Sequence, residues 1–205
     1  MNSSARDLKS PESPHATLHG RAMENLRYIR TTMERSESYT HVSGMGVAAT
    51  GVVALIAWGF AITASSDLVW LAVWLEAAAA SLALAVYTLA RKSRTEGRAV
   101  LRERGRRFAW TIVPPMTAGA VLTLALVRLG ATELLPGTWL LLYGTSFVTG
   151  GSTSVRSLPL MGSAFMLTGA LALLTPPTWG DAWMAVGFGG LHILFGINIW
   201  RSHGG

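Results

Sequence analysis

The feature that most constrains this chain is a set of long apolar segments that are almost free of charged residues. Charged residues are absent from 41–66, 108–127, 134–155, 157–180 and 182–200, and residues 68–90 contain only Glu76. About 20 apolar residues in a helix, rising ~1.5 Å each, cross a hydrocarbon core of about 30 Å. The sequence therefore predicts an all-α, polytopic membrane protein with a six-transmembrane-helix bundle, and it excludes a soluble globular domain. The predicted spans are 42–64, 68–90, 108–130, 137–155, 158–175 and 182–200.

Two absences in the sequence narrow the chemistry and the route of insertion. The chain has no cysteine, which excludes disulfides, thiolate metal sites and iron–sulfur clusters. Residues 1–40 are polar, and the first apolar segment is too long for the hydrophobic region of a signal peptide. We therefore expect no cleavable signal peptide, and the first span should direct its own insertion.

The basic residues predict the orientation in the membrane. Of the 17 Lys and Arg residues, 16 fall on one side if six spans alternate, and only Arg128 falls on the other. The connections on that other side carry Asp67, Glu133 and Asp181. The positive-inside rule then places both termini in the cytoplasm, an N-in/C-in topology. Anionic lipid headgroups account for the basic residues, so no nucleic-acid partner is expected.

The chain before the first span divides into two parts. Residues 1–17 are rich in Ser and Pro and are expected to form a disordered cytoplasmic tail. Residues 18–40 are expected to form an amphipathic helix, ahead of a membrane domain at 41–205. Apolar residues recur there at helical spacing: Ala22, Leu26, Ile29 and Met33. The helix is interpreted as lying on membrane lipids, and the alternative is that residues 18–38 dock a protein partner.

The three inward-running spans resemble one another. Each begins near a tryptophan and ends near a basic residue; the tryptophans are Trp70, Trp139 and Trp183. This pattern favours three tandem helical hairpins, with any ligand site built on the central axis from the second, fourth and sixth spans. The alternative is that every inward span needs a tryptophan as an interfacial anchor and a basic residue at its inner end.

Several polar residues lie at similar predicted depths in those three spans. Glu76 and His192 are ionisable groups about 12–15 Å into the second and sixth spans at helical rise, and such groups at membrane depth require an explanation. The fourth span contributes Tyr143, Ser146 and Thr149. We expect these five residues to line a ligand- or proton-binding pocket, in which Glu76 exchanges a proton or faces a cation and His192 is its partner. The alternative for the hydroxyls is close helix packing.

An enzymatic function is a weaker alternative. A hydroxyl on the fourth span, Ser146, and a histidine on the sixth, His192, resemble the arrangement in rhomboid intramembrane serine proteases. That family has Gly after its serine, where this chain has Phe147, and its long first loop is absent because only residues 65–67 join the first two spans. We therefore expect no catalytic residues.

Metal binding and transport are the remaining alternatives. His41 and His192 differ too much in depth to bind one haem iron, and Glu76 with His192 lacks further metal ligands, so no metal site is expected. The cofactor is left open. Six short-looped spans with a buried Glu and a buried His also suit a small transporter or a substrate-binding membrane subunit.

Three stretches, 26–46, 134–151 and 187–205, resemble a family of small bacterial six-span membrane proteins. The shared features include Gly190-Leu191-His192 near the end of the chain. The resemblance implies a protein of the bacterial cytoplasmic (inner) membrane without an established activity. With the residues above, it favours a non-enzymatic binding, sensing or accessory subunit that takes a small ligand in a polar intramembrane pocket.

Overall fold

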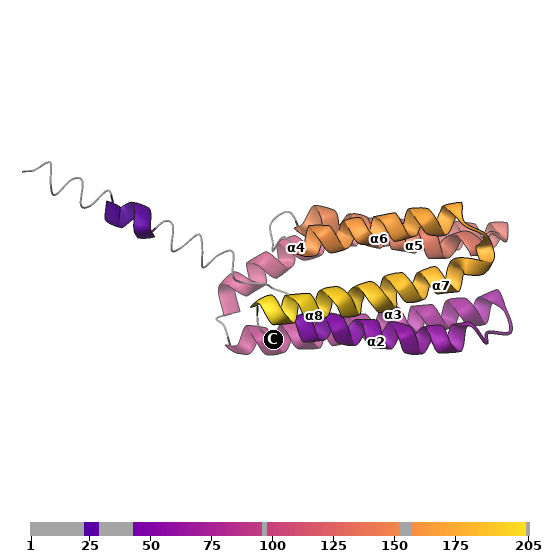
Figure 1. Ribbon diagram of the computed structural model, residues 1–205, viewed down its shortest axis with the longest axis horizontal. Helices are drawn as coiled ribbons and strands as arrows, with labels where there is room; N and C mark the ends of the chain where they lie inside the picture. Colours follow the sequence, from indigo (N-terminus) through magenta and orange to yellow (C-terminus); the bar gives the residue numbers. More distant parts are fainter. Residues whose placement is uncertain (1–22, 29–42, 96–97, 152–156, 204–205) are drawn as a thin grey trace, which may run out of the picture. The chain divides into compact units, whose positions relative to one another are not determined.

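The structure is a computed structural model, which describes residues 23–28, 43–95, 98–151 and 157–203 (Figure 1). The chain divides into two units, Met1–Ser38 and Tyr39–Gly205. The described part of the first unit is a short helix at 23–28. Most of the helix predicted at 18–40, and all of the tail predicted at 1–17, lie outside the described residues.

The second unit is built from helices alone over its described residues. The α-helices are α2 (Gly44–Ala61), α3 (Asp67–Thr95), α4 (Arg98–Leu129), α5 (Leu135–Gly151), α6 (Ser157–Leu174), α7 (Gly180–Met184) and α8 (His192–His203). A π-helix, η3 (Ala185–Leu191), joins α7 to α8, and the 3₁₀ turns η1 (Thr132–Leu134) and η2 (Pro177–Trp179) precede α5 and α7. The predicted all-α class is confirmed.

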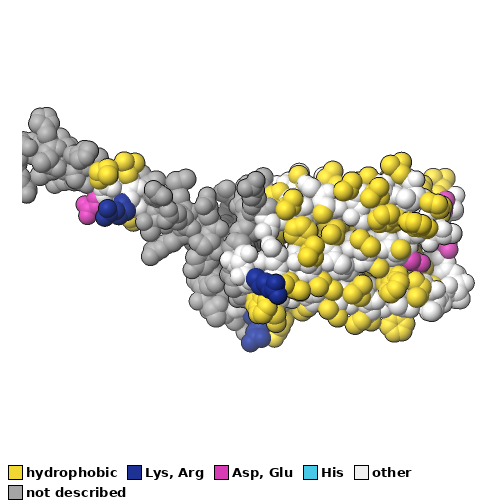
Figure 2. All heavy atoms as spheres, viewed as in Figure 1, with side chains coloured by type: hydrophobic (Ala, Val, Ile, Leu, Met, Phe, Trp, Pro, Cys, Tyr) yellow, Lys and Arg dark blue, Asp and Glu magenta, His cyan; other side chains and the backbone are white. Residues whose placement is uncertain are grey.

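The helices are long and apolar enough for a membrane protein, and Figure 2 shows hydrophobic side chains spread over the visible surface of the described bundle. Five candidate spans are found among the described residues: Gly44–Ala61, Asp67–Thr88, Trp110–Leu129, Ser157–Leu174 and Pro177–Ser202. The last one combines η2, α7, η3 and α8. The helix predicted at 137–155 corresponds to α5, which has 17 residues and is not among the five.

Pairs of neighbouring helices build the bundle. Helix α2 contacts α3 on one side and η3 and α8 on the other, while α5 contacts α4 and α6. Figure 1 shows α8 running beside α2, and α6 beside α5. Helix α3 contacts mainly α2. Little of its candidate span is buried inside the protein, so most of its surface faces away from the bundle.

Glycines spaced seven residues apart bring α5 and α6 into backbone contact. A Cβ atom added to Gly144 would lie 2.6 Å from the carbonyl oxygen of Gly162, and one added to Gly169 would lie 2.9 Å from that of Gly137. Both pairs belong to a single antiparallel register, because a step of seven residues back along α5, from Gly144 to Gly137, corresponds to a step of seven residues forward along α6, from Gly162 to Gly169. A seven-residue repeat keeps the same face of a helix toward its neighbour.

Glycines also bring α2 into backbone contact with the last helix. A Cβ atom on Gly44 would lie 2.7 Å from the carbonyl oxygen of Gly196, and one on Gly51 would lie 2.6 Å from that of Gly189. These glycines are again seven residues apart on each helix. Small residues at transmembrane interfaces allow such close approach of backbones, so these two glycine-lined pairs determine how the bundle is assembled.

The π-helix interrupts the last helix, which the sequence predicts as continuous over 182–200. Three glycines lie within four consecutive residues of the π-helix: Gly187, Gly189 and Gly190. Glycine has low helix propensity and leaves room for Leu140 and Leu55, which pack against Gly187 and Gly189. A π-turn adds one residue to the helix and so rotates the residues after it. His192, the first residue of α8, is thereby turned into the core, where it is 2% exposed.

Two of the tryptophans near the starts of the predicted inward-running spans donate hydrogen bonds to the protein through their indole N–H groups. The sequence predicts them as interfacial anchors for lipid. In the structure, Nε1 of Trp139 donates to Thr123 Oγ1 at 2.8 Å, and Nε1 of Trp183 donates to Thr175 Oγ1 at 2.7 Å. The first bond joins α4 to α5, and the second joins α7 to the residue that follows α6, so the tryptophans also hold helices together.

The glycine contacts make a direct prediction about stability. Gly162→Ala places a methyl group against the backbone of α5 and should lower the free energy of unfolding by about 1–3 kcal/mol. Gly59→Ala is the matched control, because nothing lies within 4 Å of a Cβ atom there. Thermal unfolding in detergent, followed by circular dichroism, measures both. Equal stability of the two variants would contradict the proposed role of the glycine contact.

Candidate functional site

The buried centre of the bundle contains a hydrogen-bonded tyrosine–histidine pair. The hydroxyl of Tyr143 and Nε2 of His192 are 2.7 Å apart, and Nδ1 of His192 lies 2.8 Å from the carbonyl oxygen of Phe188. A carbonyl oxygen can only accept, so Nδ1 carries the hydrogen that it donates. In the neutral imidazole Nε2 is then an acceptor, and the Tyr143 hydroxyl donates to it.

Aromatic rings enclose this pair. The ring of Tyr143 lies 4.8 Å from Phe147, 4.9 Å from Phe165 and 5.2 Å from Phe188, measured between centroids. The imidazole meets Phe165 edge-on at 5.1 Å. Tilted and edge-on contacts are the favourable geometries for aromatic rings. The pair is thus part of a packed aromatic core that connects α5, α6, η3 and α8.

The hydroxyl groups of α5 bond to their own helix. Ser146 is fully buried and donates to the carbonyl oxygen of Leu142 at 2.9 Å, while the exposed Thr149 donates to that of Thr145 at 2.9 Å. Ser146 and His192 are therefore not hydrogen-bonded to each other. The serine–histidine pair that proteolysis requires is not formed in this structure.

Glu76 lies apart from the other predicted pocket residues. Its neighbours Trp74 and Ala77 face the bundle, whereas Glu76 is exposed on the opposite part of α3. Within the described part of the chain, its carboxylate has no hydrogen bond or ion pair. The structure thus brings Tyr143 and His192 together but leaves Glu76 outside their group. That these residues bind a ligand or a proton stays a prediction.

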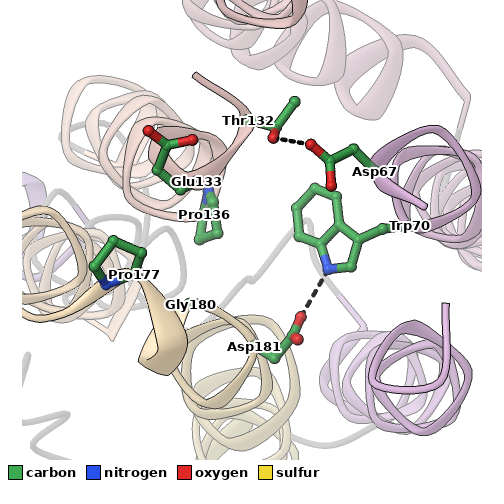
Figure 3. A pocket seen from close by; sticks show the side chains of 8 residues that line it. All are labelled: Asp67, Trp70, Thr132, Glu133, Pro136, Pro177, Gly180 and Asp181. Atoms are coloured by element: carbon green, nitrogen blue, oxygen red, sulfur yellow. Dashed lines mark hydrogen bonds between the residues drawn. The ribbon is translucent and has the colours of Figure 1, made fainter. Parts of the chain in front are cut away.

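A separate pocket opens at the end of the bundle where α3 and α7 begin (Figure 3), and we call it the outer-end pocket because the sequence predicts that this end faces the cell exterior. Its volume is about 310 Å³. Its walls come from α3, η1, the start of α5, η2 and α7, and they are formed by Asp67, Trp70, Thr132, Glu133, Pro136, Pro177, Gly180 and Asp181. This volume is at the lower end of the range for small-molecule sites.

Hydrogen bonds fix two of the three carboxylates in this outer-end pocket. Nε1 of Trp70 donates to Oδ1 of Asp181 at 2.7 Å, and the hydroxyl of Thr132 donates to the carboxylate of Asp67 (Figure 3). The Trp70 ring is itself stacked on Trp139, with centroids 5.6 Å apart. The pocket walls are therefore held in place before any ligand arrives.

The outer-end pocket is negatively charged. Among the described residues, its lining includes Asp67, Glu133 and Asp181 and no basic side chain. Arg128 lies in the last turn of α4, is exposed and is not part of the lining. In the described chain, no three His, Cys, Asp or Glu side chains are grouped so as to hold a metal ion. The three carboxylates thus line the pocket from three different elements, α3, η1 and α7.

In the sequence, these three acidic residues indicated only the orientation of the chain in the membrane. A signal for the pocket was nevertheless present, because an acidic residue precedes the tryptophan that begins each inward-running helix. The residues at the starts of those helices meet at one end of the bundle, where they line the pocket. The hairpin pattern could have predicted a ring of carboxylates there.

No protein-family model matches the chain, and neither curated proteins nor solved structures give a match.

The tyrosine–histidine bond can be tested by removing one oxygen atom. Tyr143→Phe leaves Nε2 of His192 buried without a donor, which should lower the free energy of unfolding by about 1–3 kcal/mol. Tyr87→Phe is the matched control, because Tyr87 is 58% exposed. Thermal unfolding in detergent measures both. If Tyr143→Phe is as stable as the control, the bond does not stabilise the core.

Proposed function

We propose that this chain is a non-enzymatic binding subunit of a bacterial cytoplasmic membrane, with six spans and both termini in the cytoplasm. The sixth span would be α5, which packs in full antiparallel register against α6 and is enclosed by α4 on its other side. The distribution of basic residues supports the orientation, since 16 of 17 fall on one side of six alternating spans. The outer-end pocket would then open to the cell exterior.

The ligand that we propose is a small organic cation with one or more amino groups. The observation that carries this proposal is the pocket of about 310 Å³ with carboxylates on separate walls. Their separation suits several N–H donors on an extended molecule better than one metal ion. The bonds from Trp70 and Thr132 reduce the ordering cost of binding, because they hold Asp181 and Asp67 in advance.

The geometry of the buried centre supports binding over catalysis. Tyr143 and His192 are hydrogen-bonded to each other, and the Ser146 hydroxyl is hydrogen-bonded to its own helix, so these groups act as parts of the core. The acidic pocket contains the accessible carboxylates of this end of the bundle. A transporter would share this entrance, and uptake of the bound cation into proteoliposomes distinguishes that function from binding alone.

The topology can be tested with single cysteines, because the chain has none of its own. Ser65→Cys lies between α2 and α3, and Ser202→Cys lies near the end of α8; both positions are exposed. A maleimide that cannot cross membranes should label Ser65→Cys in intact cells and label Ser202→Cys only after lysis. The reverse pattern would overturn the proposed orientation.

The ligand class can be tested by titration calorimetry on the protein in nanodiscs. We expect 1,4-diaminobutane to bind and its uncharged analogue 1,4-butanediol not to bind. Asp181→Asn keeps an oxygen acceptor for Trp70 but removes the charge, so it should weaken diamine binding about tenfold, and Glu133→Gln should do the same.

Glu76→Gln is the control for this experiment, because it removes a carboxylate outside the pocket. It should bind the diamine as the unaltered protein does. Equal binding of the diol and the diamine, or binding of calcium ions alone, would contradict an organic-cation site.

A further inference from the structure

Glu76 is placed where an ionised side chain is least favourable. It is the tenth residue of the 22-residue candidate span Asp67–Thr88, close to the middle of the apolar segment. It is also exposed on the outside of the bundle. Only 6% of this span is buried inside the protein, against 33% for α2 and for α6. A carboxylate in this position would face lipid unless another helix covers it.

The residues around Glu76 form a continuous helix face. They follow one another at spacings of three and four, and all are exposed: Val69, Ala72, Ala80, Ala83 and Tyr87. We call these residues, with Glu76, the Glu76 face. Spacings of three and four are those of a helix seam that packs lengthwise on another helix. The alanines next to Glu76 would allow a neighbouring backbone to come close.

Among the described side chains of the bundle, no cation neutralises Glu76. Of the described basic residues near the spans, Arg128 is in the last turn of α4, and Arg91 and Arg201 lie toward the opposite end of the bundle. His192 is at a similar depth, but it is buried and accepts from Tyr143. A second copy of the chain would bring a second Glu76 to the same depth, and so another negative charge. Charge complementarity therefore favours a different protein.

We propose that the Glu76 face docks a transmembrane helix of another protein, one that carries a Lys or Arg at the depth of Glu76. In the apolar core the ion pair would be desolvated on both sides, and the alanines would let the two helices approach until the charged groups meet. The ion pair would also stabilise the partner helix in the membrane, because its own charge is equally unfavourable in lipid. The docking face is separate from the outer-end pocket, and the proposal does not depend on ligand binding there.

The probe is a synthetic transmembrane peptide of about 21 Leu and Ala residues with a single central Lys. The protein carries a fluorescent donor on Ser65→Cys, its sole cysteine, and the peptide carries an acceptor. Energy transfer in lipid vesicles should show association about tenfold stronger than for a peptide with Leu in place of Lys. Glu76→Gln should abolish this preference, and Ala80→Leu should weaken association with the Lys peptide by keeping the helices apart.

Asp181→Asn is the matched control, because it removes a carboxylate from the outer-end pocket, and it should associate like the unaltered protein. Equal association of the Lys and Leu peptides with the unaltered protein would overturn the proposal, whatever the variants do. So would a retained Lys preference in Glu76→Gln. Self-association that is lost in Glu76→Gln and Ala80→Leu, without a Lys preference, would identify a second copy as the occupant and would also overturn it.

Discussion

The contact on which the rest of this structure depends is the approach of helix backbones at glycine. Lipid gives helices no hydrophobic reason to associate, so close packing and polar contacts must hold a bundle together. Here Gly144 meets Gly162 and Gly51 meets Gly189, with a second glycine pair seven residues away in each case. Two antiparallel pairs in fixed register result. Every polar group of the bundle is then positioned relative to these pairs, because the register determines which turns lie at the same depth.

The π-helix is the local adjustment that makes the register compatible with the buried centre. Gly189 and Gly196 must both face α2, and the π-turn sits around the first of them. The extra residue leaves His192 directed toward Tyr143 and lets its Nδ1 reach the carbonyl oxygen of Phe188. Buried polar atoms are costly without partners. The pair therefore favours this rotation of α8 over others, and packing and hydrogen bonding select the same arrangement.

Hydropathy and charge predicted the helices well, because the length of an apolar segment and the location of charges depend only on the sequence along the chain. The meeting of Tyr143 with His192 was also within reach, since both lie at similar depth on inward-running spans. Glu76 lies apart from these two residues for a definite reason: depth places a residue along a helix but does not say which side of the helix it occupies. Two residues before it, Trp74 is buried, and a two-residue step turns an α-helix by about 200°. The π-helix could not be expected either, because its glycines also suit an ordinary packing interface.

The carboxylates that the structure describes in the membrane domain fall into two environments, and each environment suits a different kind of cation. Asp67 and Asp181 are held by Thr132 and Trp70 at the rim of a water-accessible pocket, where a small cation can enter and leave. Glu76 lies among apolar residues of a span, where a freely diffusing cation would lose its hydration without gaining a cage of ligands. A Lys or Arg on another transmembrane helix would neutralise the charge of Glu76 better. The distinction follows from solvation, and it separates the proposed site for a soluble ligand from the proposed site for a partner helix on the same protein.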